Sequence, residues 1–178
     1  MVTSLICSRP VARLCAAAGF VSVAAWGSLA YADKTPGSDA ADAAPVTLTA
    51  EMHPDAVHPG RVANAAVKLH VADGFHIQAH KPNDPGMIAT VLKWNATPGL
   101  RIGVTAYPVP EKEKVDFADA PLLVYDGTIK LRTPVTVKSG TKPGTYKLTG
   151  SLRYQACSGS ECRAPTKLPV ELTVVVKR

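Results

Sequence analysis

The sequence predicts an all-β fold, an immunoglobulin-like β-sandwich. Short runs of alternating polar and apolar residues recur from residue 46 onward, and Pro-Gly, Asp-Gly and Ser-Gly pairs separate them. No window after residue 45 shows the periodicity of an amphipathic helix. About nine short strands with turn signals at this spacing are typical of a sandwich of immunoglobulin type.

The predicted strands are bounded by these turn signals. The run 62–71 is the clearest, because Val67 and Leu69 alternate with Lys68 and His70. In chain order, the predicted strands are 46–50, 62–71, 75–77, 88–94, 101–107, 122–125, 128–137, 145–156 and 168–176. Two stretches, 80–87 and 108–121, are too polar and too rich in proline for a ladder, and we predict long loops there. Long loops in a compact β domain are more often functional than accidental.

The N-terminus has the features of a cleaved secretory signal. Arg9 and Arg13 form a basic start without acidic residues, an apolar stretch runs from about 14 to 29, and Ala30-Tyr31-Ala32 ends it. Glycines and serines dilute the stretch, so a membrane anchor is the weaker interpretation. We therefore expect a signal peptide over 1–32, a flexible leader over 33–45 and one domain over 46–178.

Removal of the signal leaves a mildly basic chain with two cysteines. Of the 20 Lys and Arg residues, two lie in the signal, so 18 face 14 Asp and Glu residues, a net charge of about +4. The basic residues are scattered, which does not favour nucleic-acid binding. No second apolar run reaches membrane-spanning length. The expected product is a soluble periplasmic domain without stable membrane insertion, whose cysteines are Cys157 and Cys162.

The strand before the cysteine pair has one apolar face. Leu148, Leu152 and Tyr154 share it, whereas Arg153 and Cys157 fall on the opposite, polar face. If the strand stays regular, Cys157 leaves it on the solvent side. We therefore expect an accessible Cys157, and on that ground we expect it to form the mixed disulfide with a partner.

Two interpretations of the pair remain open from the residues alone. The first is a structural disulfide, as is common in exported proteins, although so short a loop contributes only about 2 kcal/mol. The second is thiol–disulfide exchange, in which one thiolate attacks a partner's disulfide and the second cysteine resolves the mixed species. Arg153 and Arg163 are placed to stabilise a thiolate, whereas Glu161 opposes it.

Three segments resemble a known family. They are GFHIQAHKPNDPGMIATVLKW (74–94), LLVYDGTIKLRTPVTV (122–137) and LRYQACSGSECRAPTKLPVELTV (152–174). Over about 46–176 they resemble the N-terminal domain of the periplasmic thiol:disulfide interchange protein DsbD. The resemblance implies an Ig-like domain that takes electrons from a membrane or thioredoxin-like donor and passes them to periplasmic thiol proteins. Full-length members continue into further domains, so here the donor is expected to be a separate protein.

The same resemblance implies roles for individual residues. Cys157 and Cys162 correspond to the redox pair. The family has a cap loop whose aromatic residue covers the disulfide, and here Phe117, flanked by Asp116 and Asp119, is the candidate. An aromatic lid of this kind excludes stray thiols and gates exchange. The alternative is that Phe117 is simply a core residue at the end of a loop.

Other chemistries lack a pattern in this sequence. The histidines and methionines do not form a compact cluster, and His76 and His80 would lie about 13 Å apart along a strand, so no metal site is predicted. The sequence has no thioredoxin-type CxxC, haem-attachment, nucleophile-elbow or phosphate-loop motif, and no cofactor is expected. A binding or assembly protein with a structural disulfide is the alternative function.

Overall fold

The computed structural model describes residues 44–178, which form strands and loops without a helix. The predicted signal peptide, 1–32, and nearly all of the predicted leader, 33–45, lie outside the described residues. Within the described part of the chain, no helix is long and apolar enough to cross a bilayer.

One face of the sandwich is a four-stranded antiparallel sheet. It consists of β1 (Val46–His53), β3 (Val62–Val71), β9 (Thr128–Val137) and β6 (Leu100–Ile102), in the order β1-β3-β9-β6. Alternation explains the pairing: along β3 the apolar residues Val67, Leu69 and Val71 are buried, whereas Lys68 and His70 are exposed.

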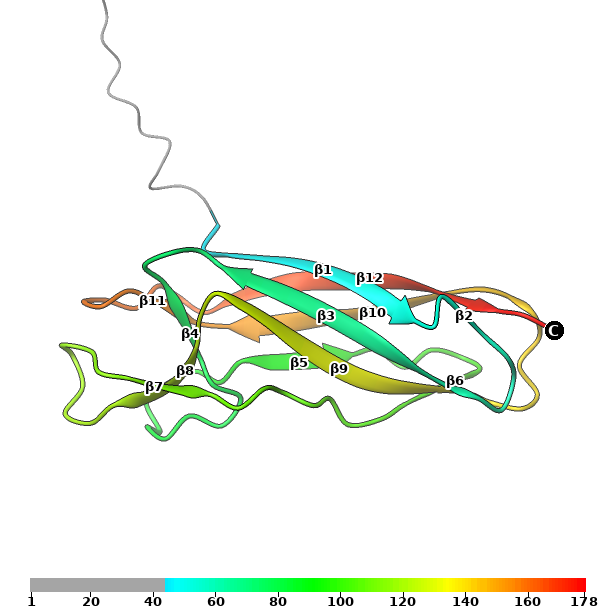
Figure 1. The fold of residues 1–178 in the computed structure, drawn as a ribbon, viewed down its shortest axis with the longest axis horizontal. Helices are drawn as coiled ribbons and strands as arrows, with labels where there is room; N and C mark the ends of the chain where they lie inside the picture. The colour runs from blue at the N-terminus through cyan, green and yellow to red at the C-terminus, as the bar shows by residue number, and fades with distance from the viewer. Residues whose placement is uncertain (1–43) are drawn as a thin grey trace, which may run out of the picture. The chain divides into compact units, whose positions relative to one another are not determined.

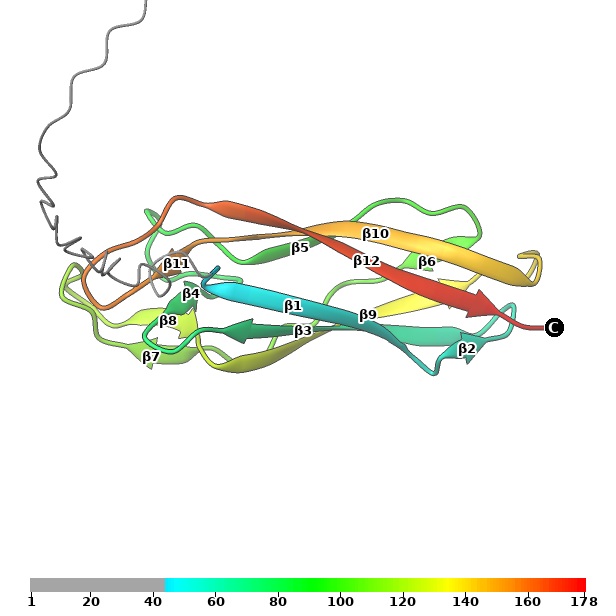
Figure 2. The same cartoon turned by 90° about the horizontal axis from the view of Figure 1, so that it is seen from above.

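The second face is built around the two longest strands. Its order is β2 (Ala56–Val57), β12 (Thr166–Val176), β10 (Gly144–Tyr154) and β5 (Val91–Trp94), with β2 parallel to β12 and the other pairs antiparallel. In Figure 2, β10 and β12 form one layer and β1, β3 and β9 the other. Leu69 and Leu131 from the first sheet share a buried cluster with Leu152 and Val170 from the second. The immunoglobulin-like sandwich predicted from the sequence is confirmed.

A third, smaller sheet lies at one end of the sandwich. It contains β11 (Ala156–Cys157), β4 (His76–Gln78), β8 (Leu122–Tyr125) and β7 (Glu111–Glu113), in the order β11-β4-β8-β7. Figure 1 places these strands at the end opposite the C-terminus. The small sheet positions Cys157, which lies on β11. Only one residue outside the strands, Gln155, separates β11 from β10.

The structure differs from the predicted strands in a few places. The stretch 108–121, predicted as a loop, contains β7, whose backbone pairs with β8 although its side chains are charged. The predicted strand 145–156 is divided, because Gln155 leaves the ladder to β12 and the following two residues pair with β4 instead. Both differences depend on pairing with strands far away in sequence, which local periodicity does not report.

Candidate functional site

Cys157 and Cys162 face each other across a tight hairpin and form a disulfide. The S–S distance is 2.04 Å and the two Cα atoms are 3.9 Å apart. Two backbone hydrogen bonds flank the pair: Arg163 N donates to Ala156 O at 2.8 Å, and Ser158 N donates to Glu161 O at 2.8 Å. The cysteines therefore occupy a non-hydrogen-bonded position of an antiparallel ladder, where opposite side chains come closest.

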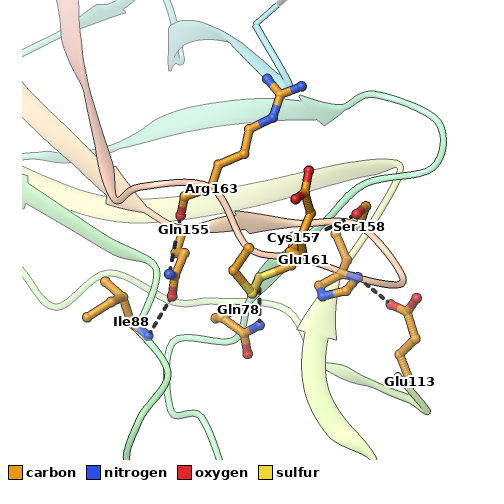
Figure 3. Close-up of a disulfide and its surroundings, with 10 residues drawn as sticks. Gln78, Ile88, Glu113, Gln155, Cys157, Ser158, Glu161 and Arg163 are labelled. Atoms are coloured by element: carbon orange, nitrogen blue, oxygen red, sulfur yellow. Dashed lines mark hydrogen bonds and ion pairs between the residues drawn. A yellow bond between two sulfur atoms is a disulfide. The ribbon is translucent and has the colours of Figure 1, made fainter. Parts of the chain in front are cut away.

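The two cysteines differ in their exposure to solvent. Cys157 is 0% exposed, whereas Cys162, on the returning arm of the hairpin, is exposed. The expectation that Cys157 would leave its strand on the solvent side is therefore wrong. The break at Gln155 transfers Cys157 into the small sheet, where β4 and the hairpin cover it (Figure 3). Of the two cysteines, Cys162 is the one with solvent-exposed surface.

Two polar residues of β4 lie beside Cys157. In the antiparallel pairing of β4 with β11, His76 is directly opposite Cys157, and the Gln78 side chain donates from Nε2 to Cys157 Sγ at 3.5 Å. His76 is 2% exposed and Gln78 is 0% exposed. Burying two such side chains is costly unless they are hydrogen-bonded, so their place beside a sulfur requires an explanation.

A carboxylate from β7 reaches His76. Glu113 Oε2 lies 3.0 Å from His76 Nδ1, and the Glu113 side chain keeps 40% of its surface exposed (Figure 3). Cys157, His76 and Glu113 come from β11, β4 and β7, so the small sheet aligns a sulfur, an imidazole and a carboxylate across its width.

Gln155 connects the hairpin to the loop before β5. Its Oε1 accepts a hydrogen bond from Ile88 N at 3.2 Å, and its Nε2 donates to Arg163 O at 3.3 Å (Figure 3). Gln155 thereby joins two segments. One is the returning arm of the hairpin beside Cys162, and the other is the chain directly after the loop 80–87.

Charged residues flank Cys162 in the sequence, and one of them contacts an aromatic ring. Glu161 and Arg163 are the sequence neighbours of Cys162, and the Arg163 guanidinium lies over the Phe75 ring, 4.6 Å from its centroid. Cation–π contact of this kind holds the arginine close to the hairpin. In Figure 3 the Arg163 side chain extends away from the disulfide, so the expectation that this arginine stabilises a thiolate has no contact to support it.

The predicted cap loop lies beside the hairpin. Asp116 N donates to Gly159 O at 3.3 Å, which joins the β7–β8 loop to the tip of the hairpin. Val115 is buried with Leu122 and Val124, whereas Phe117 is 37% exposed and lies outside the three clusters of the described residues. Asp116 and Asp119 are exposed. Phe117 is therefore not a core residue at the end of the loop.

Asn83 connects the two predicted loops. Its Nδ2 donates to Pro121 O at 2.9 Å, and its Oδ1 accepts from Leu123 N at 2.9 Å. Both ends of the β7–β8 loop are thus held, one by the buried Val115 and the other by Asn83. The part between them, which carries Phe117, has fewer anchors.

Tyr154 supports the site from the core. It is 1% exposed, and burial raises the pKa of its hydroxyl, while a hydrogen bond with Thr166 and the charge of Arg163 act in the opposite direction. The expectation that Tyr154 faces inward is confirmed. Trp94 is partly buried against both large clusters and donates from Nε1 to Thr133 Oγ1 at 2.9 Å.

The histidines weighed as metal ligands have other neighbours. His80 stacks on Tyr107 with 3.8 Å between ring centroids, and His76 contacts Glu113. Among residues 44–178, no group of three or more His, Cys, Asp or Glu side chains is arranged to hold a metal ion.

Comparison with known families decides where the chain belongs. The family described as the N-terminal part of thiol:disulfide interchange protein DsbD matches residues 43–173, which includes every strand of the site. The chain belongs to this DsbD N-terminal family. The resemblance noted in the sequence is thereby confirmed, and thiol–disulfide interchange is the chemistry of the family. No curated protein sequence matches the chain.

Several solved structures are similar to this DsbD-family domain. The N-terminal periplasmic domain of ScsB from Proteus mirabilis is 20% identical, with a TM-score of 0.49, over 71% of this chain and 44% of that one. The chain thus spans less than half of the ScsB domain. The reduced DsbD N-terminal domain of Neisseria meningitidis is 21% identical, with a TM-score of 0.43, over 71% and 84% of the two chains. A complex of the DsbD and PilB N-terminal domains from Neisseria meningitidis matches at 23% identity and a TM-score of 0.41, over 70% and 80%.

Three residues beside the disulfide of this DsbD-family domain were missed from the sequence. His76 was weighed only as a metal ligand, and Gln78 and Glu113 were not considered. The detectable signal was two polar residues, His76 and Gln78, alternating in a short strand directly after the Asp73-Gly74 turn. Their closeness to Cys157 follows from the pairing of β4 with β11, which joins residues about 80 positions apart.

Proposed function

We propose that this chain is an exported thiol–disulfide relay whose Cys157–Cys162 pair alternates between disulfide and dithiol. The difference in exposure between the cysteines supports this most directly. A bridge that serves stability alone gains nothing from an exposed sulfur at a hairpin edge, whereas exchange needs one sulfur within reach and one held back. Catalysis of exchange would make the protein a thiol–disulfide oxidoreductase.

The exposed sulfur has the role of first contact. An incoming donor thiolate attacks Cys162 Sγ, and Cys157 leaves as a thiolate and takes up a proton. In the opposite direction the Cys162 thiolate attacks a partner's disulfide, and Cys157 then attacks Cys162 and releases the partner as a dithiol. This assignment reverses the expectation drawn from strand alternation, because Cys157 is enclosed.

Partners of the relay are other thiol proteins. We propose a membrane or thioredoxin-like thiol–disulfide protein as the electron donor and periplasmic thiol proteins as acceptors. One similar structure is a complex between DsbD and PilB N-terminal domains, which gives an instance of such a domain bound to another protein.

The compartment and the division of the chain belong to the same proposal. A signal peptide over 1–32 exports the chain to the periplasm, 33–45 is a leader, and 46–178 is the working domain. Disulfides form and persist in such an oxidising compartment, so a relay there meets disulfide-bonded proteins. Mass spectrometry of the protein from a periplasmic extract tests cleavage after Ala32, and an intact N-terminus contradicts it.

A redox titration tests the relay. Free thiols of the mature protein are trapped with a mass-tagged alkylating reagent across a glutathione or dithiothreitol series. A midpoint between roughly −270 and −120 mV with a folded protein in both states supports exchange. A midpoint below about −300 mV, or unfolding on reduction, makes the bridge structural and supports the alternative of a binding or assembly protein.

Trapping with single-cysteine variants tests the order of attack. We expect Cys157→Ala to accumulate a mixed disulfide through Cys162 with a disulfide-bonded probe such as oxidised glutathione. Cys162→Ala should form far less, because its remaining thiol is buried. Equal trapping by both variants, or trapping by Cys162→Ala alone, contradicts the assignment.

A further inference from the structure

Two buried polar atoms beside Cys157 lack hydrogen-bond partners. His76 Nε2 and Gln78 Oε1 have none among the described residues, although the two side chains are 2% and 0% exposed. Nearly all buried polar atoms in proteins are hydrogen-bonded, and a redox or catalytic role is one of the explanations for an exception. Both exceptions here lie on β4, next to the atom whose chemistry changes when the disulfide opens.

The strand register places both side chains on the same side of the sheet as Cys157. Opposite residues of an antiparallel pair have Cβ atoms about 5 Å apart on the same face, and His76 is directly opposite Cys157. Gln78, two residues along, is on that face too and already donates to Cys157 Sγ. Reduction turns this sulfur into a thiol, which needs a hydrogen-bond acceptor, or a thiolate, which needs a donor.

Glu113 determines which nitrogen of His76 can accept a proton. An ionised carboxylate only accepts hydrogen bonds, so the contact of 3.0 Å means that Nδ1 carries the hydrogen. In the neutral ring, Nε2 then holds the lone pair. The buried imidazole therefore keeps a free proton-accepting atom, and a carboxylate stands on its far side to stabilise the imidazolium.

We infer that His76 is the proton acceptor and donor for Cys157, with Gln78 stabilising the thiolate and Glu113 positioning the imidazole. This inference rests on the proposed function, since it concerns the resolving step of the relay. The exposed Cys162 exchanges protons with water, whereas the enclosed Cys157 needs an internal group for this task.

In the direction of partner reduction, His76 takes up the proton of Cys157 before the new sulfur–sulfur bond forms. The partner is first linked to Cys162 by a mixed disulfide. The Cys157 thiol then gives its proton to His76 Nε2. The Cys157 thiolate attacks Cys162 Sγ, the Cys157–Cys162 bond forms, and the bond from Cys162 to the partner breaks. The partner leaves as a thiolate and is protonated by water, and the imidazolium returns its proton to solvent. Two electrons pass from the dithiol to the partner disulfide.

The ionisable groups around His76 lie on β7, on β11 and directly after β8. Glu113 on β7 is the ion-pair partner, and Cys157 on β11 is opposite. Asp126 comes directly after β8, whose last residue, Tyr125, pairs with Ile77 of β4, and Asp126 is exposed.

Rapid-quench mass spectrometry with oxidised glutathione as the probe separates the two steps. The reduced protein is mixed with the probe, quenched with acid, and the glutathione adduct on Cys162 is followed as it forms and as it resolves. His76→Phe keeps the ring size and removes both nitrogens, and Glu113→Gln keeps a hydrogen-bond acceptor and removes the charge. His80→Phe is the matched control, because His80 is a partly buried histidine of the same domain that stacks on Tyr107, outside the site.

We expect His76→Phe to slow resolution on the order of 100-fold while adduct formation stays within about twofold. Glu113→Gln should slow resolution less, and His80→Phe should leave both steps unchanged. Unchanged resolution in His76→Phe, or an equal slowing of both steps, overturns the inference. If His76→Phe fails to fold, unchanged resolution in Glu113→Gln overturns it instead.

The wild-type protein separates this inference from the function on which it rests. If the wild type forms and resolves the adduct and His76→Phe resolves it at the same rate, only the role of His76 is contradicted. A wild type that forms no adduct at all contradicts the relay itself, and the inference with it.

Discussion

Gln155 is a single residue on which the geometry of the site depends. It is the position where the chain leaves the ladder of β10 with β12, and its side-chain amide then bonds Ile88 N and Arg163 O. A glutamine serves both contacts because it carries an acceptor and a donor on one planar group. Cys157 is enclosed, and Cys162 exposed, in consequence of this change of sheet.

At the same scale, the buried tyrosines predict a pH dependence of stability. Burial raises the pKa of Tyr154, Tyr125 and Tyr107. Below the unfolded pKa of about 10 both states keep their protons, and above it the unfolded state releases protons first, so the free energy of unfolding falls as the pH rises. Urea unfolding between pH 7 and 11 should show no loss from these groups below about pH 9 and a decline beyond it. Tyr154→Phe should make the decline shallower, and an identical decline in that variant contradicts the argument.

At the scale of elements, Gly150 determines how closely β5 approaches β10. A Cβ at this position would lie 2.6 Å from Lys93 O and 2.8 Å from Trp94 Cε3, both on β5. We expect Gly150→Ala to lower the free energy of unfolding by about 1–3 kcal/mol, because the two strands must separate. Gly140→Ala, where a Cβ meets nothing within 4 Å, is the control and should change it by less than about 1 kcal/mol in either direction. Equal midpoints in urea for both variants would contradict the close packing.

The β7–β8 loop predicts gated access to the disulfide. Its backbone contacts the hairpin through Asp116, while Phe117 keeps 37% of its surface exposed. If the ring shields the disulfide, Phe117→Ala should raise the rate of reduction by dithiothreitol several-fold, because small thiols then reach Cys162 without displacing the loop. Val109→Ala, at an equally apolar residue that is 90% exposed, should leave the rate unchanged. An unaltered rate of reduction in Phe117→Ala would contradict a shielding role for this ring.

At the scale of the whole molecule, the fold should survive loss of its disulfide. Two large hydrophobic clusters lie in the sandwich, and the bridge closes a hairpin of only a few residues at one end. The chain-entropy cost of so short a loop is about 2 kcal/mol. The variant Cys157→Ala, Cys162→Ala should therefore unfold cooperatively, with a Tm lower by roughly 5 to 12 °C, as circular dichroism would measure. Loss of cooperative unfolding at 25 °C would show that the bridge holds the domain together.

Much of this molecule could be predicted from local patterns, and the errors share one cause. Strands such as β3 and β9 have a period of two in sequence, and their predicted bounds match the structure. Alternation assumes that a strand stays in one sheet, and it therefore gave Cys157 the wrong environment after Gln155. In the same way β7 was missed, since its charged residues pair with β8 through the backbone alone.

The two cysteines of the candidate site could be predicted from the sequence, whereas the residues beside them could not. The cysteine pair follows from counting residues, and the family from the segments around it. His76 and Glu113 belong to strands that β8 separates, so only the assembled sheet brings the carboxylate to the imidazole.

The unequal exposure of the cysteines also affects how the protein withstands oxidative damage. We expect peroxide to react with Cys162 in the reduced protein, because Cys162 is exposed and Cys157 is enclosed. The first product, a sulfenic acid on Cys162, stands opposite a thiol on the neighbouring arm of the hairpin. Condensation of the two releases water and restores the disulfide before irreversible sulfinic acid can form. The same hairpin that exposes Cys162 thereby holds the Cys157 thiol beside it, and this thiol protects Cys162 from irreversible oxidation.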